Sequence, residues 1–412
     1  MKAALPWVGA AAIALVLPHL FTGGFGLSLL CRMGIGVVFA LSFNMLLGQG
    51  GMLDFGHAVF LGMGGFLAMH AMRLADAGWW LPTPLLPLMG ALGGLIVAIP
   101  AGWIATRRDR TAFAMITLGL AELIVAVVLM FPHVFGGEEG LNGDRSGGPP
   151  VFGLDFGTQF QVFHLIAAWA LVCAFLMWRF TRTPLGRLSN AVRDNSERVA
   201  FLGYDPARVR FLVFAISGLF AGVAGGLQAI NDEIVTSANI GSAASGSVLL
   251  MAFIGGVGTF WGPVLGAVLV TLLQVALGTV TDAWQLYSGL LFVAMVVWAP
   301  GGLSGILLAH APIFRAGQGR RLIAGYAAML PGSVAVLLGI VTLCETAFRL
   351  QAVRGGAPAI EQHVLGLPAD PTELAPWIVG IVLVLVGFLA LRPASRSAHG
   401  AWMEATAAAA SA

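Results

Sequence analysis

Long apolar runs alternate with short polar segments along almost the whole chain. Because a hydrocarbon core of about 30 Å is crossed by about 20 helical residues, each run can be counted as one candidate membrane span. Twelve runs qualify, at 5–22, 29–47, 57–73, 85–105, 111–131, 160–180, 209–230, 247–257, 262–279, 285–299, 322–343 and 376–391. The pattern predicts an all-α fold, a polytopic transmembrane helical bundle of about ten spans followed by two C-terminal spans.

The pair of runs at 247–257 and 262–279 is ambiguous. Between them lies the segment 255–263, GGVGTFWGP, whose glycines and proline disfavour a continuous helix. Irregular backbone at membrane depth is tolerated only where protein or water satisfies its polar groups. Two full spans and a broken or re-entrant helix pair are equally consistent with this pattern.

A polar insert at 183–210 interrupts the apolar pattern between two spans. Within it, 187–202 has the spacing of one short amphipathic helix, with Leu188, Val192, Val199 and Leu202 near one face. Gly203 stands where a C-terminal helix cap is expected. The insert is therefore the place at which this membrane protein would meet a soluble partner; the alternative is a solvated loop at the membrane surface.

Composition and charge agree with a membrane protein. Hydrophobic residues make up 58% of the chain and charged residues only 10%, against about 25% charged residues in soluble domains. When the spans are threaded from a cytoplasmic N-terminus, sixteen of the 21 Lys and Arg residues fall on the cytoplasmic side. The positive-inside rule then predicts an N-in, C-in topology. The first run is expected to be a retained anchor span, 1–24, rather than a cleaved signal peptide.

Local signatures of catalysis are missing from the sequence. A Walker-type phosphate loop needs a lysine, and the only lysine in the chain is Lys2. Neither a Gly-x-Ser-x-Gly elbow nor a His-Glu-x-x-His pair occurs, and the 8 histidines are scattered. We therefore expect no catalytic residues and no metal site. A membrane hydrolase stays open as an alternative, because an intramembrane protease can carry its serine and histidine on separate helices.

Four polar residues lie on otherwise apolar spans: Asn44, Gln49, His57 and Glu122. Such residues are costly in lipid and usually face a cavity or a neighbouring helix. We expect part of this set to border a translocation pathway, with simple interhelical hydrogen bonding as the alternative. The glycine clusters at 48–51, 62–65 and 222–226 are expected mainly to let helices approach closely, and the three cysteines are interpreted as small core residues.

Four longer blocks follow one another along the chain. They are 41–65 (LSFNMLLGQGGMLDFGHAVFLGMGG), 111–122 (TAFAMITLGLAE), 186–203 (GRLSNAVRDNSERVAFLG) followed by 214–225 (FAISGLFAGVAG), and 255–266 (GGVGTFWGPVLG) followed by 300–303 (PGGL). In this order they resemble the Liv-type permeases, the membrane subunits of branched-chain amino acid ABC importers. The resemblance covers about residues 25 to 310. It is closer to the LivM-like than to the LivH-like half of such a permease pair, chiefly because of the long outer loop at 132–159.

The resemblance implies a permease subunit of an ATP-driven importer in a bacterial inner membrane. Such a subunit moves branched-chain or similar small hydrophobic amino acids inward by alternating access and does no chemistry of its own. Its implied partners are two cytoplasmic ATPase subunits, a second, LivH-like permease subunit, a periplasmic solute-binding protein and the lipid bilayer, with no nucleic acid. No cofactor is expected on this chain, since the partner subunits use the ATP.

The polar insert is similar to the ATPase-contacting loop of these permeases. The resemblance makes the following residues candidates for ATPase coupling: Gly186, Arg187, Arg193, Asn195, Glu197, Ala200 and Gly203. A helix docked in a groove of the partner is a common recognition mode and suits a segment with one apolar stripe and one charged face.

The chain departs from the family after about residue 310. We therefore expect a permease domain at 25–310 and a C-terminal extension at 311–412, with two further spans, a connecting loop and a disordered tail from Glu404. Urea, short amides and aromatic acids are alternative substrates within the family. From a different class, an ion-coupled secondary carrier would need inverted halves with matching broken helices, and one clear break is visible, at 255–263.

Overall fold

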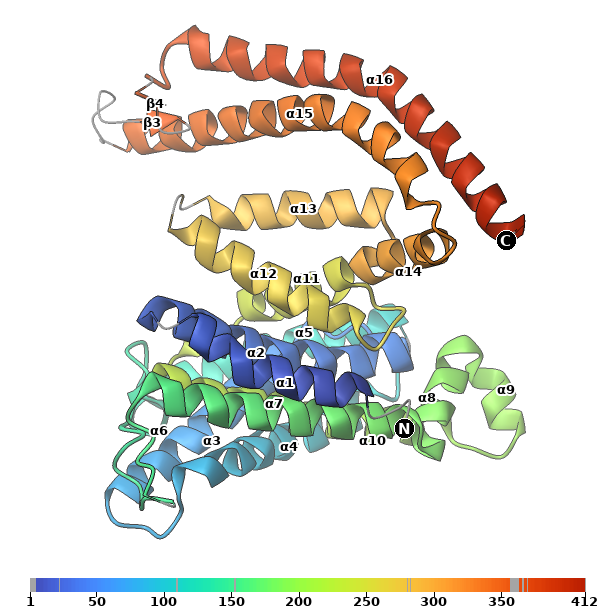
Figure 1. Cartoon of the computed structure of the whole chain (residues 1–412). Helices are drawn as coiled ribbons and strands as arrows, with labels where there is room; N and C mark the ends of the chain where they lie inside the picture. Colours follow the sequence, from blue (N-terminus) through green and yellow to red (C-terminus); the bar gives the residue numbers. More distant parts are fainter. Residues whose placement is uncertain are drawn as a thin grey trace. The chain divides into compact units, whose positions relative to one another are not determined.

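The chain folds into two compact units. The computed structural model describes residues 5–21, 23–108, 110–151, 153–279, 281, 283–355, 363–364, 367–368 and 370–411, so that Lys2 and Glu361 lie outside the described residues. Unit 1 comprises Met1–Thr279 and Ser288–Gly305, and unit 2 comprises Val280–Tyr287 and Ile306–Ala412. Figure 1 labels the α-helices of both units.

The described part of the chain is almost entirely helical. Unit 1 contains α1 (Leu5–Leu20), α2 (Gly24–Asn44), the π-helix η1 (Met45–Gln49), α3 (Ala58–Asp76), the 3-10 helix η2 (Thr83–Leu85), α4 (Leu86–Ala105), α5 (Arg110–Met130), α6 (Pro132–Phe135), α7 (Gln159–Thr181), α8 (Pro184–Asp194), α9 (Ser196–Phe201), α10 (Pro206–Asp232), the 3-10 helix η3 (Ser237–Asn239), α11 (Ser242–Gly255) and α12 (Gly262–Gly278). Residues of α13 (Trp284–Trp298) and α14 (Gly302–Arg315) are divided between the units, and unit 2 continues with α15 (Gly319–Arg354) and α16 (Leu374–Ser411). Two short antiparallel pairs complete the fold: β1 (Leu141–Asn142) with β2 (Ile234–Val235), and β3 (His363–Val364) with β4 (Leu367–Pro368).

The helix content confirms the all-α, polytopic prediction. Among the described residues, 9 helices are long and apolar enough to cross a membrane, or 10 if the pair α13 and α14, bent by 45°, counts as one span. The sequence predicted twelve spans because it also counted two helices that fall short of spanning length, Trp7–Leu20 and Gly262–Gly278. The ambiguous pair forms two separate helices, α11 and α12, packed against each other on either side of the turn at Gly256.

Three helices of unit 1, α3, α4 and α10, pack with their backbones in close contact. An ideal Cβ atom on Gly222 of α10 would lie 2.2 Å from the carbonyl oxygen of Gly90, and one on Gly225 would lie 1.8 Å from that of Leu61. Neither position accepts a side chain, so glycine is required by the close approach of the helices. The packing role expected for the clusters at 62–65 and 222–226 is confirmed.

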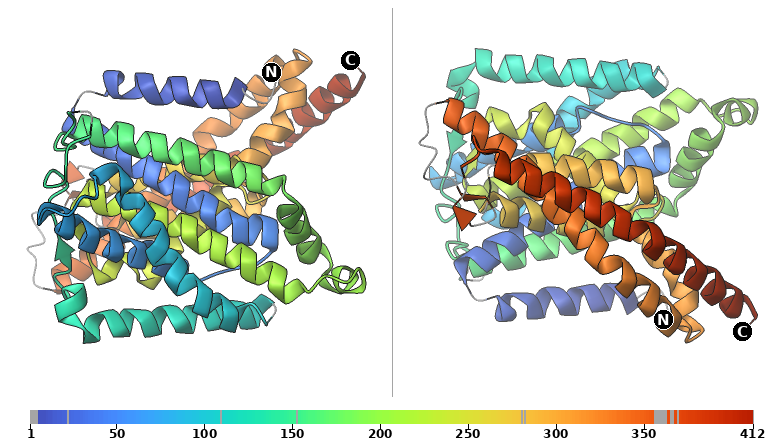
Figure 2. Two further views of the ribbon diagram at one scale, coloured as in Figure 1. Left: turned by 90° about the horizontal axis from the view of Figure 1, so that it is seen from below. Right: turned by 90° about the horizontal axis from the view of Figure 1, so that it is seen from above.

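Helices α1 and α5 lie along opposite flanks of unit 1, with the other long helices between them (Figure 2). Within α5, the candidate span Thr111–Met130 is only 28% buried, whereas Pro206–Asp232 of α10 is 72% buried. Helix α5 therefore has a wide face that the described part of unit 1 leaves uncovered.

In unit 2, α15 and α16 form a long antiparallel hairpin. Its contact uses glycines spaced by seven residues: an ideal Cβ atom on Gly339 would lie 2.8 Å from the carbonyl oxygen of Gly380, and one on Gly332 would lie 3.0 Å from that of Gly387. These small residues let the two helices approach as closely as helices do in other membrane bundles.

Helices extend into three segments that lie outside the predicted spans. Residues 300–321 contain α14, which begins at Gly302, where φ is +64°. The expected connecting loop is shorter than predicted because α15 runs on to Arg354. The tail from Glu404, which was expected to be disordered, lies within α16, which continues to Ser411. Alanine is the strongest helix former, and the tail is rich in it.

Helix α15 continues beyond the predicted span 322–343, and this continuation carries a buried carboxylate, Glu345. Glu345 accepts hydrogen bonds from the Tyr287 hydroxyl at 3.0 Å and from Nε of Arg349 at 3.2 Å, and it is 6% exposed. All three residues belong to unit 2. The charge is therefore paired inside the unit, as an ionisable group in a membrane helix requires.

Candidate functional site

The polar insert forms an elbow of two helices, α8 and α9, instead of the single helix that the sequence predicted. The chain bends at Asn195, which has extended backbone angles (φ −158°, ψ 99°) and accepts a hydrogen bond from the amide of Arg198 at 2.9 Å. An asparagine side chain that caps the next helix competes with continuation of the previous one. Gly203 ends α9 with φ of +87°, which agrees with the expected cap.

The inner side of the elbow packs on the start of α10. Val192, Val199 and Val209 are buried together, and Leu185 and Leu188 pack against them. Gly186 is also buried. An ideal Cβ atom there would lie 2.3 Å from the carbonyl oxygen of Phe180, so the position has no room for a side chain. The remaining candidate coupling residues are exposed: Arg187, Arg193, Asn195, Glu197, Ala200 and Gly203.

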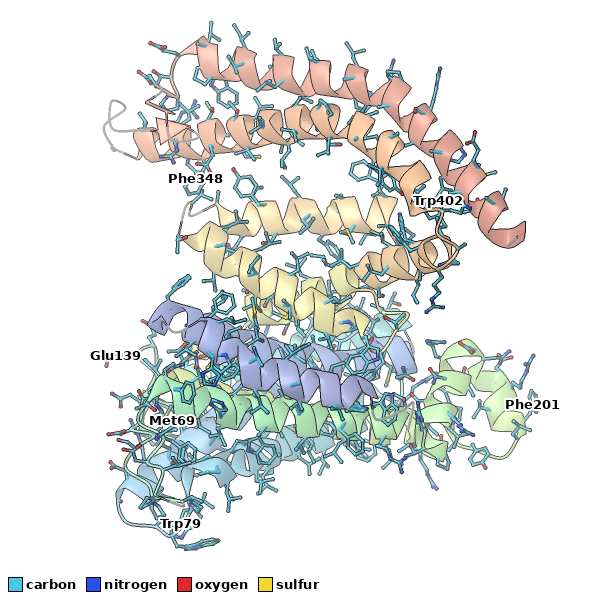
Figure 3. All side chains as sticks on the ribbon, in the orientation of Figure 1. Met69, Trp79, Glu139, Phe201, Phe348 and Trp402 are labelled. Carbon is cyan, nitrogen blue, oxygen red and sulfur yellow. The ribbon has the colours of Figure 1, made fainter. Side chains whose placement is uncertain are left out.

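The tip of the elbow presents three apolar or aromatic side chains to solvent. Phe201 is 91% exposed, Leu202 70% and Tyr204 52%. Figure 3 shows Phe201 at the far end of α9, pointing away from unit 1. Such a cluster of exposed apolar side chains is unusual in a polar segment. Sequence reasoning missed it because it assigned Leu202 to the inner face; the signal was the run of apolar residues around Gly203.

Two polar contacts join the elbow to η1, which directly follows α2. The Asn190 side chain donates to Oε1 of Gln49 at 2.8 Å, and the Arg193 guanidinium donates to the carbonyl oxygen of Gly48. Beside these contacts lies a polar cavity of about 300 Å³, lined by Gly51, Arg108, Arg193, Asn195 and Arg210 among others. Of the predicted pathway residues, Gln49 is thus the one in contact with the elbow.

The other predicted pathway residues lie at different depths. Asn44, at the end of α2, is 2% exposed, and its Oδ1 atom is buried with no hydrogen-bond partner in the described part of the chain. His57 is completely buried among the rings of Phe39, Phe43 and Phe60. Asn44, Gln49 and His57 are grouped around η1 and the segment that follows it.

Glu122 is not brought together with these three residues. It lies on α5 and is exposed, whereas its neighbour Ala121 is 1% exposed and lines the inner side of the same helix. The carboxylate therefore projects from the uncovered face of α5.

Ser42, His57 and Asp54 form a buried chain of polar groups that sequence reasoning also missed. Oγ of Ser42 lies 2.9 Å from Nε2 of His57, and Nδ1 of His57 lies 3.3 Å from Oδ2 of Asp54. These are the residue types of a hydrolase triad. All three residues are 0% exposed, and the Ser42 hydroxyl donates to the carbonyl oxygen of Phe39 at 2.7 Å. A substrate cannot reach this hydroxyl, so the chain of contacts fixes the start of α3 and does not form a hydrolase site.

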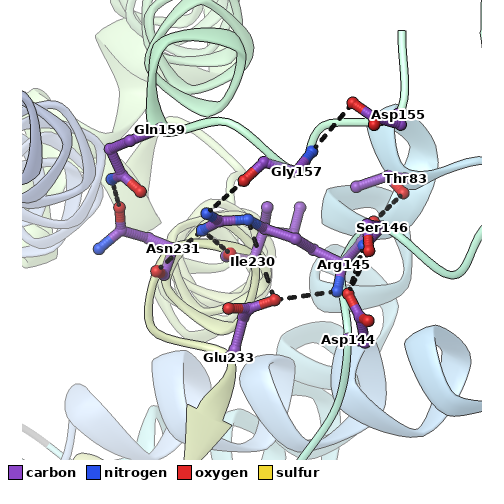
Figure 4. Close-up of polar contacts among 10 residues, drawn as sticks. All are labelled: Thr83, Asp144, Arg145, Ser146, Asp155, Gly157, Gln159, Ile230, Asn231 and Glu233. Atoms are coloured by element: carbon purple, nitrogen blue, oxygen red, sulfur yellow. Dashed lines mark hydrogen bonds and ion pairs between the residues drawn. The ribbon is translucent and has the colours of Figure 1, made fainter.

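At the end of unit 1 opposite the elbow, Arg145 ties the long loop after α6 to the end of α10 (Figure 4). Its guanidinium donates to the carbonyl oxygens of Ile230 and Asn231, both at 3.3 Å, and of Gly157 at 3.1 Å. Its backbone amide donates to Oε1 of Glu233 at 3.1 Å. A cation on the last carbonyls of a helix compensates the helix dipole.

The same loop is acidic and exposed. Hydrogen bonds from the Ser146 hydroxyl and amide hold the pKa of Asp144 below its usual value. Glu138 and Glu139 precede Asp144 in the chain, and Glu139 lies at the end of unit 1 opposite Phe201 (Figure 3). Among the described residues, no group of three or more His, Cys, Asp or Glu side chains could hold a metal ion.

The arrangement is that of a polytopic membrane protein with a two-helix elbow at one end of unit 1. Residues 26–300 match the family model described as the permease component of the branched-chain amino acid transport system, so the chain belongs to this family. It is thus a multi-pass membrane protein and a transport subunit, and permeases of this family are not catalytic and bind no cofactor themselves.

Curated relatives agree with the family. The chain is 28% identical over 288 residues to the LivM permease protein of the high-affinity branched-chain amino acid transport system of Escherichia coli K12, covering 65% of this chain and 67% of that protein. It is 23% identical over 290 residues to the LivH permease protein of the same strain, covering 65% of this chain and 90% of that protein. It is also 25% identical over 248 residues to the autoinducer 2 import permease LsrC of E. coli O9:H4, covering 57% of this chain and 68% of that protein. No solved structure matches the chain.

Proposed function

We propose that this chain is the membrane-spanning subunit of an ATP-driven importer that moves branched-chain or similar small hydrophobic amino acids into the cell by alternating access. Membership of the permease family supports a transport role, and the LivM and LivH proteins named above belong to a branched-chain amino acid system. The similarity to LsrC, an autoinducer 2 permease, is a reason to include other solutes as competitors in the transport assay.

The observation that carries this proposal is the elbow α8–α9. Its inner stripe is satisfied by α10, while Phe201, Leu202 and Tyr204 stand in solvent and the candidate coupling residues surround them. An exposed apolar tip framed by charged side chains fits a groove on a soluble protein. In an importer that groove belongs to an ATPase subunit, and two ATPases would serve this permease and its LivH-like partner.

Glu122 supports a second permease subunit on the flank of α5. An exposed carboxylate in the middle of a membrane span is costly against lipid and is normally covered by a protein partner or by a water-filled pathway. Helix α5 has the wide uncovered face on which such a partner would pack. We therefore place the translocation pathway at this face, between the two permease subunits.

The orientation follows from the same assignment. If ATPases dock on the elbow, the elbow is cytoplasmic and the acidic loop around Asp144 faces the periplasm, which agrees with the N-in, C-in topology predicted from the arginine distribution. The Arg145 contacts would then hold the loop that a periplasmic solute-binding protein approaches.

The experiment has two readouts, uptake of labelled leucine and co-purification of ATPase subunits with the tagged permease. Cells that lack this chain should lose high-affinity uptake, and the intact chain should restore it. The Phe201→Glu variant should insert normally but lose the ATPases and the uptake, because it places a charge at the centre of the apolar tip. Trp80→Glu, a matched change at a 70% exposed aromatic residue of the opposite end, should retain the ATPases.

Two results would contradict the proposal. Normal ATPase binding and uptake by Phe201→Glu would remove the elbow as the docking surface. Unchanged leucine uptake in cells lacking the chain would remove the proposed substrate class. For the pathway, Glu122→Cys in a background without the three native cysteines should react with a small hydrophilic thiol reagent in at least one nucleotide state, and no reaction in any state would exclude α5 from the pathway.

A further inference from the structure

The elbow reaches the transmembrane core of unit 1 through few elements. Helix α8 contacts α7, from which the chain enters the elbow, α10, to which the chain returns, and the π-helix η1. The contact with η1 joins the elbow to a part of unit 1 that is distant in sequence, since Asn190 and Gln49 are 141 positions apart. The π-helix η1 therefore lies on a direct route between α8 and the core residues around Asn44.

The two side chains that make this contact are held in place. The Asn190 amide donates both to Gln49 and, at 3.2 Å, to the carbonyl oxygen of Gly186 one turn earlier in α8. Arg193 donates to the carbonyl oxygen of Gly48 and pairs with Asp194 at 3.1 Å. Both residues lie on the side of α8 that faces η1, so α8 and η1 are connected at two points about one helical turn apart.

The π-helix is a favourable place for a conformational change. π-Helical turns are rare, hold one residue more than an α-helical turn, and occur frequently at functional sites. An ideal Cβ atom on Gly48 would lie 2.3 Å from Oδ1 of Asn44 and 2.9 Å from the carbonyl oxygen of Val257, so η1 is packed tightly against the loop between α11 and α12. The buried, unpartnered Oδ1 of Asn44 lies at this same point.

The cavity of about 300 Å³ gives the elbow room to move. Its lining includes Asn195 at the bend, Gly51 in the segment that follows η1, and Arg108 between α4 and α5. Rotation of the elbow into this space would pull on Gly48 and Gln49 and shift the chain that leads from η1 to Asp54 and His57. The buried contacts of Asp54, His57 and Ser42 would then carry the shift into the start of α3.

We propose that Asn190 and Arg193 are positioning residues that link the docking elbow to the π-helix η1, and that a change of η1 between two backbone arrangements transmits ATPase movement to the translocation pathway. This inference rests on the proposed function, because it takes the elbow to be the ATPase docking site. It adds the residues and the element through which the movement passes.

Exchanges between amide and carboxylate test the Asn190–Gln49 contact without changing side-chain shape. Asn190→Asp keeps a hydrogen bond, because the Gln49 amide can turn and donate its N–H, and Gln49→Glu keeps one because Asn190 still donates. The double variant places two carboxylates opposite each other and loses the contact. In the purified complex with its ATPases, we expect each single variant to keep at least half of the stimulation of ATP hydrolysis by substrate-loaded binding protein. In the double variant this stimulation should fall about tenfold, with ATPase stoichiometry unchanged.

A second set of variants contains no carboxylate repulsion. Asn190→Ala, Gln49→Ala and the double alanine variant should show the same loss of stimulation, because residues that act through one contact are not additive. Arg193→Ala should also lose stimulation. Arg208→Ala serves as its control, because Arg208 lies in the same region and pairs with Asp205, but its side chain is 86% exposed.

The link would be overturned if the fraction of stimulation kept by the double carboxylate variant equalled the product of the fractions kept by the two single variants. It would also be overturned if the losses of stimulation in the alanine series were additive. The proposed function is judged separately by the wild-type complex. If the wild type fails to import labelled leucine but its ATP hydrolysis is stimulated by another loaded binding protein, the substrate class is wrong and the link is still tested by the same ratios.

Discussion

The contact between α4 and α10 allows one quantitative prediction about stability. At Gly222, an ideal Cβ atom would lie 2.2 Å from the carbonyl oxygen of Gly90, 2.9 Å from Cα of Gly94 and 2.9 Å from its amide nitrogen. All three are backbone atoms, which cannot rotate away as a flexible side chain would. To restore ordinary contact distances after Gly222→Ala, the two helices have to separate by about 1 Å, and the loss of packing affects both.

The expected cost follows from overpacking. Inserting a methyl group into a well-packed core costs about 1–3 kcal/mol. Gly119→Ala on α5 is the matched control, because an ideal Cβ atom there has nothing within 4 Å. That variant should be neutral or more stable by up to about 1 kcal/mol, since alanine is the better helix former. The two alanine variants should therefore differ by about 1–4 kcal/mol, with Gly222→Ala the less stable.

The assay is equilibrium unfolding of the purified permease in mixed detergent micelles, followed by tryptophan fluorescence and by size-exclusion elution. Both variants should reach the membrane. A Gly222→Ala variant as stable as Gly119→Ala would show that α4 and α10 are not in backbone contact and would refute the glycine-based packing of this core.

Two further predictions concern other parts of the fold. Arg145→Ala should lower stability by about 3 kcal/mol in the same unfolding assay, because it leaves Glu233 and the carbonyl oxygens at the end of α10 without their cation. Arg145→Lys should restore only part of the lost stability, since an ammonium group cannot reach three carbonyl groups in a fixed fork. A chain stopped after Arg315 and carrying Tyr287→Phe should insert, assemble with its ATPases and take up labelled leucine at a rate comparable to that of the full chain, because the carboxylate that Tyr287 contacts, Glu345, is removed with the hairpin; loss of uptake despite normal assembly would show that α15 and α16 take part in transport.

The helices were predictable from the sequence because apolar runs of spanning length have few alternatives in lipid. The glycine contacts were predictable in kind, since small residues in such runs serve close packing. The break of the elbow was not, because the apolar spacing of 187–202 continues through Asn195 and only the capping bond to Arg198 shows that the chain bends there.

The candidate site shows the same division. Side chains such as Gln49 and Glu122 could be selected by their polarity, but periodicity does not reveal which of them meet. The contact of Gln49 with Asn190 joins positions 141 residues apart, and the contact of Ser42 with His57 depends on how the segment after η1 folds back onto α2. Such long-range contacts depend on tertiary packing, which the local pattern of apolar and polar residues does not predict.

The hairpin of unit 2 is too long to be contained in a bilayer. Helix α16 has 38 residues and α15 has 36, which at about 1.5 Å per residue corresponds to about 57 and 54 Å. Even at a tilt of about 40°, the upper end of the range for membrane helices, α16 would extend about 44 Å along the membrane normal, against a hydrocarbon thickness of about 30 Å. About three turns of α16 must therefore stand in the headgroup region or in water. At the alanine-rich end of α16, Ala405 packs against Ile313 and Leu322. This end is thus a rigid segment outside the hydrocarbon, and a fluorophore attached to it would report on the tilt of the whole hairpin.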